Sequence, residues 1–327
     1  MILAADIGGT KVNLALFQEE RETLRLVEEA TFSSKQYSEF EGIIREFLGK
    51  TGVVISQSCC GVAGPVKDGR CQVTNLPWVV EARKLQVLLE TDAVWLVNDF
   101  VAMACAVPFL DDVDIEVLQE GRPDLQGRIA VLGAGTGLGQ AFLVPDGGGS
   151  YIILDSEGGH CDFSPRDHVE AELLKFLLKK FDRISVERVL SGSGLFHIYQ
   201  FMNHYNSFVE PEWLTKELSE NDPAAVIAGS GLKNPACAMA LEMFVALYGS
   251  VAGNLALQVL ARGGVFIGGG MAPKIVSIMR CGLFMEAFLS KGRFRSLMSD
   301  IPVKIIMNDK APLLGAAHYA LGRKFRR

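Results

Sequence analysis

The chain has 327 residues, of which 49% are hydrophobic and 21% are charged, and its formal net charge is −6 at pH 7. At about 150 residues per domain, this length predicts two domains, each with its own core. The acidic balance argues against a nucleic-acid partner, because the one basic run is the short tail at 323–327, which we expect to be solvated.

We predict an alternation of strands and helices over the first third of the chain. The hydrophobic pattern indicates strands at 2–5, 12–17 and 24–31, a helix at 37–48, strands at 58–62 and 94–97, and a helix from Phe100. Such an alternation predicts a mixed sheet with a parallel part. A loop-rich passage at 108–124 then precedes a second strand, turn and strand at 129–144.

The remainder is more helical. It reads as helices at 169–181 and 193–205, helix-compatible pieces within 210–234, a core helix at 236–261, a strand at 265–267, a helix from Pro273 and a last helix at 312–321. We expect a small α/β domain at 1–106, with a C-terminal helix at 311–327 packing back on it, and a large α/β domain at 107–310. The apolar stretch 243–261 contains polar residues and glycines, which favours a buried helix over a membrane span.

The cysteines predict a reducing compartment. They are odd in number and show no C-x-x-C spacing that would hold zinc or form a redox pair. The N-terminus lacks the basic and long apolar regions of a secretion signal. We therefore expect a cytoplasmic protein with seven reduced thiols, at Cys59, Cys60, Cys71, Cys105, Cys161, Cys237 and Cys281.

One glycine-rich turn pattern occurs twice, each time between two apolar runs. The first copy is Asp6-Ile7-Gly8-Gly9-Thr10-Lys11, and the second is the GAGTGLG segment at 133–139. Neither copy fits the Walker or the dinucleotide-binding motif. Consecutive backbone N–H groups in such turns can converge on an anion, so the pair predicts a polyphosphate held by both loops. The alternative is ordinary hairpin turn chemistry.

Asn98 and Asp99 stand where a strand ends and a helix begins. Ligands of open α/β sheets gather at the carboxyl ends of strands, so Asp99 is a candidate catalytic carboxylate. The alternative is that Asp99 only caps the helix.

A second polar group comprises Glu157, His160 and Glu187. Carboxylates and an imidazole paired in this way can bind the vicinal hydroxyls of a sugar. The alternatives are a structural histidine and an exposed ion pair of Glu187 with Arg188 or Lys179. Glu157 and His160 could also suggest metal ligands, but we do not expect a complete metal site there.

Two further small-residue segments follow predicted strands or turns. Gly268-Gly269-Gly270 follows a predicted strand. Because these three residues have no side chains, a flat nucleotide base could lie against their backbone. The turn at 74–78, which contains Asn75, fits either a loop beside a binding site or a plain turn. The turn at 191–194 opens a helix whose N-terminus could face an anion or a purine, or could be a simple cap.

Taken in order, these motifs resemble the bacterial glucokinase family, within the hexokinase, actin and Hsp70 ATPase superfamily. The resemblance runs from the first glycine turn to Leu313-Leu-Gly-Ala and so covers nearly the whole chain. It implies two ribonuclease-H-like, actin-like ATPase domains, with mixed sheets flanked by helices and the active site in the interdomain cleft. It also implies transfer of the ATP γ-phosphoryl group to the 6-hydroxyl of glucose, in a cytoplasmic enzyme that we expect to be a homodimer.

The resemblance also assigns residues. Asp99 would be the general base, and Asp6 would reach Mg²⁺ through water. The sugar-binding residues would be Asn75, Asn98, Asp99, Glu157, His160 and Glu187. The ATP-binding residues would be Asp6, Ile7, Gly8, Gly9, Thr10, Lys11, Gly135, Thr136, Gly137, Gly269 and Gly270.

This sequence departs from some close relatives at Lys11 and Asn13, where those relatives have Asn-Ala. Lys11 could contact phosphate or only cover the surface. The zinc-binding cysteine motif of the broader repressor and kinase group is absent, which favours the glucokinase branch. The remaining alternatives are a kinase for mannose or an N-acetylhexosamine, a sugar-sensing regulator without catalysis, and an assembly ATPase.

Overall fold

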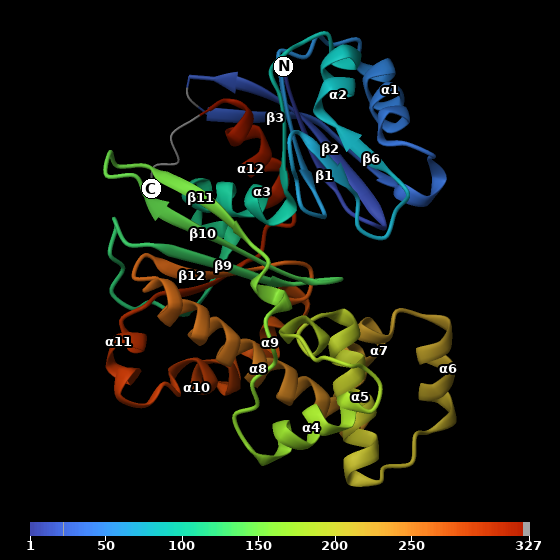
Figure 1. Cartoon of the computed structure of the whole chain (residues 1–327), viewed down its shortest axis with the longest axis vertical. Helices are drawn as coiled ribbons and strands as arrows, with labels where there is room; N and C mark the ends of the chain where they lie inside the picture. The colour runs from blue at the N-terminus through green and yellow to red at the C-terminus, as the bar shows by residue number, and fades with distance from the viewer. Residues whose placement is uncertain (22, 323–327) are drawn as a thin grey trace. The chain divides into compact units, whose positions relative to one another are not determined.

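The computed structural model describes residues 1–21 and 23–322 (Figure 1). Its packing divides these residues into two units. The first comprises 1–112, 143–155 and the described residues from 308 onward, and the second comprises 113–142 and 156–307. The domain boundaries at 106 and 310 stay a prediction. The basic tail and the end of the expected helix 311–327 fall at 323–327, outside the described residues.

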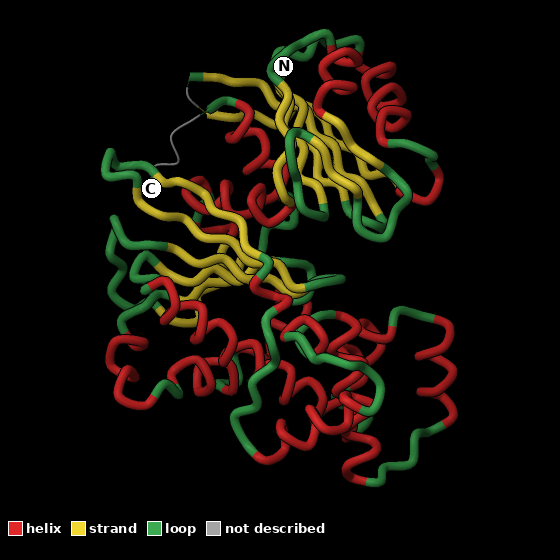
Figure 2. The backbone as a smooth tube through the Cα atoms, viewed as in Figure 1, coloured by secondary structure: helices red, strands yellow, loops and turns green. Residues whose placement is uncertain are grey.

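The first unit contains a five-stranded mixed sheet (Figure 2). Strand β1 pairs antiparallel with β2 and parallel with β4, and β4 pairs parallel with β7, which confirms the expected mixed sheet with a parallel part. The strand order is β3 (Thr23–Ser33), β2 (Lys11–Glu20), β1 (Ile2–Ile7), β4 (Gln57–Val62) and β7 (Val94–Asn98).

Alternation along β1 places hydrophobic side chains on both faces of this sheet. Leu3, Ala5 and Ile7 belong to a core with α1 (Phe40–Thr51) and α2 (Ala82–Leu89). Ile2 and Ala4 belong to a second core with α3 (Asp99–Ala106) and α12 (Ala311–Ala320). Since alternate strand residues share a face, Asp6 lies on the side of α3 and α12.

Helices α3 and α12 approach closely. A Cβ at Gly315 of α12 would lie 1.9 Å from the carbonyl oxygen of Ala102 in α3. Only glycine fits there, so this contact fixes the helix that begins at Asp99 against α12.

The second sheet has six strands. Strand β12 pairs parallel with β9 and with β13, and β8 pairs antiparallel with β13. The strand order is β11 (Tyr151–Ser156), β10 (Leu138–Pro145), β9 (Ile129–Ala134), β12 (Gly264–Gly268), β13 (Val303–Ile306) and β8 (Ile115–Gln119).

The largest core surrounds α8 (Pro235–Val259), in which Phe244, Tyr248 and Ala252 are fully buried. Within the described residues, α8 is long and apolar enough to cross a membrane, but 67% of its apolar window is buried inside the protein. The other α-helices of the second unit are α4 (His168–Leu178), α5 (Gly192–Asn206), α6 (Glu212–Glu220), α7 (Pro223–Ser230), α9 (Val276–Met279), α10 (Leu283–Leu289) and α11 (Arg295–Ser299).

Several elements were not identified from the sequence. These are short elements or edge strands, where few residues carry a periodic signal. They comprise α2, α10, α11, β8, β11, β13 and the small hairpin of β5 (Arg70–Gln72) and β6 (Val79–Glu81).

Candidate active site

In the first unit, three parallel strands end level with one another. Ile7 of β1 is the register partner of Val62 of β4, and Val62 is the partner of Asn98 of β7. The segments that follow these strands therefore leave from one edge of the sheet. That edge carries the first glycine loop and the Asn98–Asp99 pair, which are about 90 residues apart in the sequence.

Non-local contacts hold the first glycine loop. The N–H of Gly8 donates to the Lys11 carbonyl at 3.0 Å. Ser34 is fully buried, and its hydroxyl donates to the Gly8 carbonyl at 3.0 Å while its N–H donates to the Thr10 carbonyl at 3.1 Å. No motif in the sequence marks Ser34, because its partners are about 25 residues away.

The turn containing Asn75 lies against this loop. A Cβ at Gly9 would lie 3.0 Å from the Thr74 carbonyl oxygen and 3.4 Å from the Asn75 Cβ. Asn75 has a left-handed backbone, with φ of 64°. Asparagine tolerates this conformation better than most residues, so a turn role is sufficient to explain its presence.

Asp6 belongs to a polar chain that crosses the sheet. The Asn13 side-chain amide donates to Asp6 Oδ2 at 3.1 Å, and the Thr31 hydroxyl donates to Asn13 Oδ1 at 2.9 Å. Burial raises the pKa of the Asp6 carboxyl, and the Asn13 hydrogen bond and the Lys11 charge oppose that rise. A bound cation would relieve the cost of burying this carboxylate, so the residue fits a magnesium site.

At the end of β7, the helix cap is Asn98. Its Oδ1 accepts the Phe100 N–H at 2.9 Å, and its Nδ2 donates to the Gly64 carbonyl at 3.3 Å. Asp99 is the first residue of α3, is partly buried, and also accepts the Phe100 N–H at 2.9 Å. Asn98 thus caps the N-terminus of α3, and the cap does not depend on Asp99.

In the second unit, the other glycine segments lie side by side. Gly133 of β9 is the register partner of Gly268 of β12, so the loops at 135–137 and 269–270 begin at neighbouring strand ends. Gly269 has a φ of 80°, and a Cβ there would lie 2.6 Å from the Ala134 carbonyl oxygen. The Gly135 N–H donates to the Gly137 carbonyl at 2.8 Å, which closes the second glycine turn.

Glu187 contacts this second turn. Its Oε2 accepts the Leu138 N–H at 2.9 Å, and a Cβ at Gly137 would lie 2.6 Å from the same oxygen. Arg188 lies with its guanidinium carbon 4.4 Å from the centre of the Phe181 ring. The structure therefore gives the Glu187 carboxylate a backbone partner that sequence reasoning missed.

Glu157 and His160 lie near the same turn. The two side chains are exposed and 3.8 Å apart, between His160 Nε2 and Glu157 Oε2. A Cβ at Gly159 would lie 2.3 Å from the Leu138 carbonyl oxygen, and the Val186 N–H donates to the Cys161 carbonyl at 2.9 Å. The second unit thus gathers Glu157, His160 and Glu187 around Leu138.

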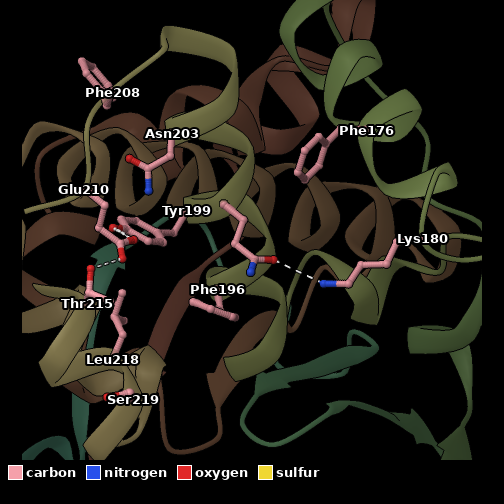
Figure 3. A pocket seen from close by; sticks show the side chains of 11 residues that line it. Phe176, Lys180, Phe196, Tyr199, Asn203, Phe208, Glu210, Thr215, Leu218 and Ser219 are labelled. Atoms are coloured by element: carbon pink, nitrogen blue, oxygen red, sulfur yellow. Dashed lines mark hydrogen bonds between the residues drawn. The ribbon is translucent and has the colours of Figure 1, made fainter.

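A separate cavity of about 740 Å³ lies among α4, α5 and α6 (Figure 3). Inside it, Tyr199 and Thr215 donate their hydroxyls to Glu210, each at 2.6 Å. The cavity lining contains none of the site residues predicted from the sequence. Across the described part of the chain, no group of three or more His, Cys, Asp and Glu side chains could hold a metal ion by itself. A magnesium ion held by substrate phosphates and one carboxylate needs no such group.

Comparisons with known proteins agree on one family. A family model described as Glucokinase matches residues 3–323. A glucokinase from Synechocystis sp. is 39% identical, covering 96% of this chain and 96% of its own length. The crystal structure of a glucokinase from an Antarctic psychrotroph is 33% identical, with a TM-score of 0.84, and covers 98% of this chain and 99% of its own.

A more distant structure shares the fold. A ROK family glucokinase from Streptomyces griseus, solved in complex with glucose and AMPPNP, is 18% identical with a TM-score of 0.67, covering 98% of this chain and 99% of its own. These likenesses confirm the predicted fold class, an α/β protein of the actin-like ATPase type with two mixed sheets.

Proposed function

Because the chain belongs to the bacterial-type glucokinase family and is a hexose 6-phosphotransferase, we propose that Asp99 is its general base. In this proposal Asp99 accepts the proton of the glucose 6-hydroxyl as that oxygen attacks the γ-phosphorus of ATP. The main support is the level ending of β1, β4 and β7, which brings Asp99 to the same sheet edge as the first glycine loop.

ATP would be bound by backbone groups of the glycine segments. In the first unit these are Asp6 to Lys11, and in the second they are Gly135, Thr136, Gly137, Gly269 and Gly270. A glycine turn with free N–H groups favours phosphate oxygens. When bound, Mg²⁺ neutralises phosphate charge, and Asp6 would hold it, through water. Lys11 is exposed beside Asp6 and either contacts phosphate or only covers the surface.

The residues that we propose for glucose binding are Asn75, Asn98 and Asp99 in the first unit, and Glu157, His160 and Glu187 in the second. Asn98 and Glu187 are already oriented by backbone hydrogen bonds, which lowers the entropy lost when they bind a hydroxyl. Asn75 is exposed and lies beside Gly9 of the first glycine loop.

The assignment is tested by a coupled assay with ATP and Mg²⁺ on glucose, mannose, fructose and N-acetylglucosamine. We expect glucose-dependent ADP formation, with glucose preferred. Preference for mannose or N-acetylglucosamine would identify a kinase for another hexose. Sugar binding without ADP formation would indicate a sugar-sensing regulator instead.

The same proposal includes a cytoplasmic homodimer. Sedimentation of the purified protein checks the assembly, since a single species at the mass of one chain would contradict it. Localisation of the tagged protein in fractionated cells checks the compartment.

A further inference from the structure

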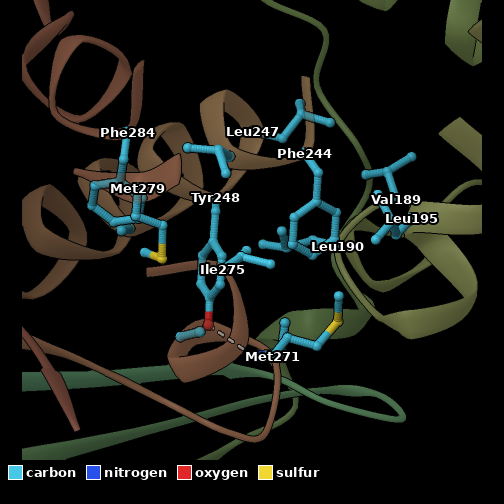
Figure 4. Packing of buried hydrophobic residues seen from close by; sticks show 14 of the residues in the cluster. Val189, Leu190, Leu195, Phe244, Leu247, Tyr248, Met271, Ile275, Met279 and Phe284 are labelled. Atoms are coloured by element: carbon cyan, nitrogen blue, oxygen red, sulfur yellow. Dashed lines mark hydrogen bonds between the residues drawn. The ribbon is translucent and has the colours of Figure 1, made fainter. Parts of the chain in front are cut away.

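Tyr248 is a polar side chain in the middle of the largest core. It lies on α8 and is fully buried, and its ring packs against those of Phe244 and Phe284 (Figure 4). Burial raises the pKa of the phenol, so its hydroxyl keeps its proton and can donate a hydrogen bond. A buried phenol hydroxyl needs polar partners, and their position shows what this one does.

The partners are the backbone ends of two neighbouring strands. The hydroxyl accepts the Ala134 N–H of β9 at 2.9 Å and donates to the Gly268 carbonyl of β12 at 3.4 Å. Gly133 and Gly268 are the last register partners of these strands. The phenol therefore bridges β9 and β12 at the position where the pairing of the two strands ends.

Two of the segments assigned to ATP start at this point. The turn at 135–137 follows Ala134 directly, and Gly269 and Gly270 follow Gly268. The Met271 N–H donates to the Ala134 carbonyl at 3.2 Å, and Gly269 approaches the same carbonyl too closely for any side chain. A change in the spacing of the strand ends would thus displace both segments together.

We propose that Tyr248 is a positioning residue for ATP, acting through its hydroxyl on the spacing of the turn at 135–137 and the segment at 269–270. The inference rests on the assignment of these two segments to ATP. Tyr248 touches no substrate in this proposal, because its side chain is fully buried. Its effect falls mainly on nucleotide affinity, since the bridge fixes Ala134 and Gly268, from which both ATP segments start, whereas Glu187 contacts the far end of the turn, at Leu138.

The test is Tyr248→Phe, which keeps the ring and removes the bridge. We expect the KM for ATP and the dissociation constant of ATP to rise roughly tenfold, as for the loss of a buried hydrogen bond. The KM for glucose should change less than about twofold on the same argument.

The matched control is Tyr199→Phe. Tyr199 is also buried in the second unit, and its hydroxyl donates to Glu210. Both variants should lower the melting temperature, but only Tyr248→Phe should weaken ATP binding. The proposal is overturned if ATP affinity is unchanged in Tyr248→Phe, or if the KM values for ATP and glucose rise together in both variants. Direct ATP binding to the wild-type protein separates this result from a failure of glucose phosphorylation.

Discussion

Two features of Asp99 let its proposed catalytic role be tested separately from its place in the helix. It is a carboxylate in the first turn of α3, where the helix N-terminus favours negative charge, and the neighbouring Asn98 performs the capping role. Because Asn98 satisfies the cap, replacing Asp99 should leave the start of α3 intact. This separation allows catalysis and stability to be measured independently.

We therefore predict that Asp99→Asn retains the fold and glucose binding but loses kcat by a factor on the order of 10² to 10⁴, the usual contribution of a general base. Steady-state kinetics and calorimetric glucose titration measure the two quantities. Asp92→Asn is the control, because Asp92 is exposed and precedes β7, whereas Asp99 follows it. A kcat near that of the control would eliminate Asp99 as the base.

We expect the stability of the second unit to depend on pH through His197. Burial lowers the pKa of its imidazole; the hydrogen bond from Nδ1 to the Arg188 carbonyl opposes this, and the charges of Lys180 and Arg188 add to the lowering. Below the unfolded pKa of about 6.5, the unfolded chain binds a proton that the folded chain resists. The folded state is therefore penalised as the pH falls, and the penalty is absent above about pH 6.5.

His197→Asn can still donate a hydrogen bond but does not titrate. Between about pH 7.5 and pH 5.5, the free energy of unfolding should fall more for the wild-type protein than for this variant. Urea unfolding at both pH values measures the difference. Equal losses in the two proteins would show that His197 is not the titrating group.

At the scale of elements, the two glycine turns are held differently. Ser34 braces the first turn from the segment that follows β3, and Glu187 contacts the second through Leu138. The second turn also accepts the Gly192 N–H, at the start of α5, on the Gly135 carbonyl at 2.8 Å. Through the Leu138 contact, the second turn is linked directly to Glu187, a residue that we propose binds glucose.

Gly137→Ala tests that link. The added Cβ would meet the Glu187 carboxylate, which is the end of a flexible side chain, so Glu187 should move away with little loss of stability. We expect roughly tenfold weaker glucose binding in the absence of nucleotide, because a charged hydrogen bond is lost. Isothermal calorimetry measures it.

Gly135→Ala is the matched control within the same turn, since a Cβ there meets no atom within 4 Å. Its glucose affinity without nucleotide should equal that of the wild-type protein. Equal glucose affinity in Gly137→Ala and Gly135→Ala would contradict the role of Glu187.

The long or strongly patterned elements were predicted closely from the sequence. The expected helix at 236–261 is α8, and the expected strands at 58–62 and 94–97 are β4 and β7. Helix α2 was missed because it has eight residues and only two buried ones, Leu85 and Leu89. Strand β8 was missed because none of its residues is fully buried, which weakens the alternation that marks a strand.

At the scale of the whole molecule, burial separates the seven cysteines into two classes. All seven are free, and only Cys161 and Cys281 are exposed. Burial raises the pKa of the other five thiols, to about 12 for Cys60 and about 11 for Cys237. Because the thiolate is the reactive form, the buried five should be inert in the folded protein.

Titration of the native protein with an aromatic disulfide reagent should therefore detect two fast thiols. The same titration in denaturant should detect all seven, since no thiol is paired. Fewer than seven in denaturant would indicate a disulfide, and more than two fast thiols in the native protein would indicate that the core opens readily.

The sequence by itself determined the family, the mixed sheets and the positions of the glycine turns. These features depend on short contiguous segments of the sequence, because turns and strand alternation are set by neighbouring residues. Only the tertiary structure decided that Ser34 braces the first turn, that Glu187 contacts Leu138 and that Tyr248 bridges β9 and β12. Each of these contacts joins residues 26 or more positions apart, and such pairings leave no local pattern in the sequence.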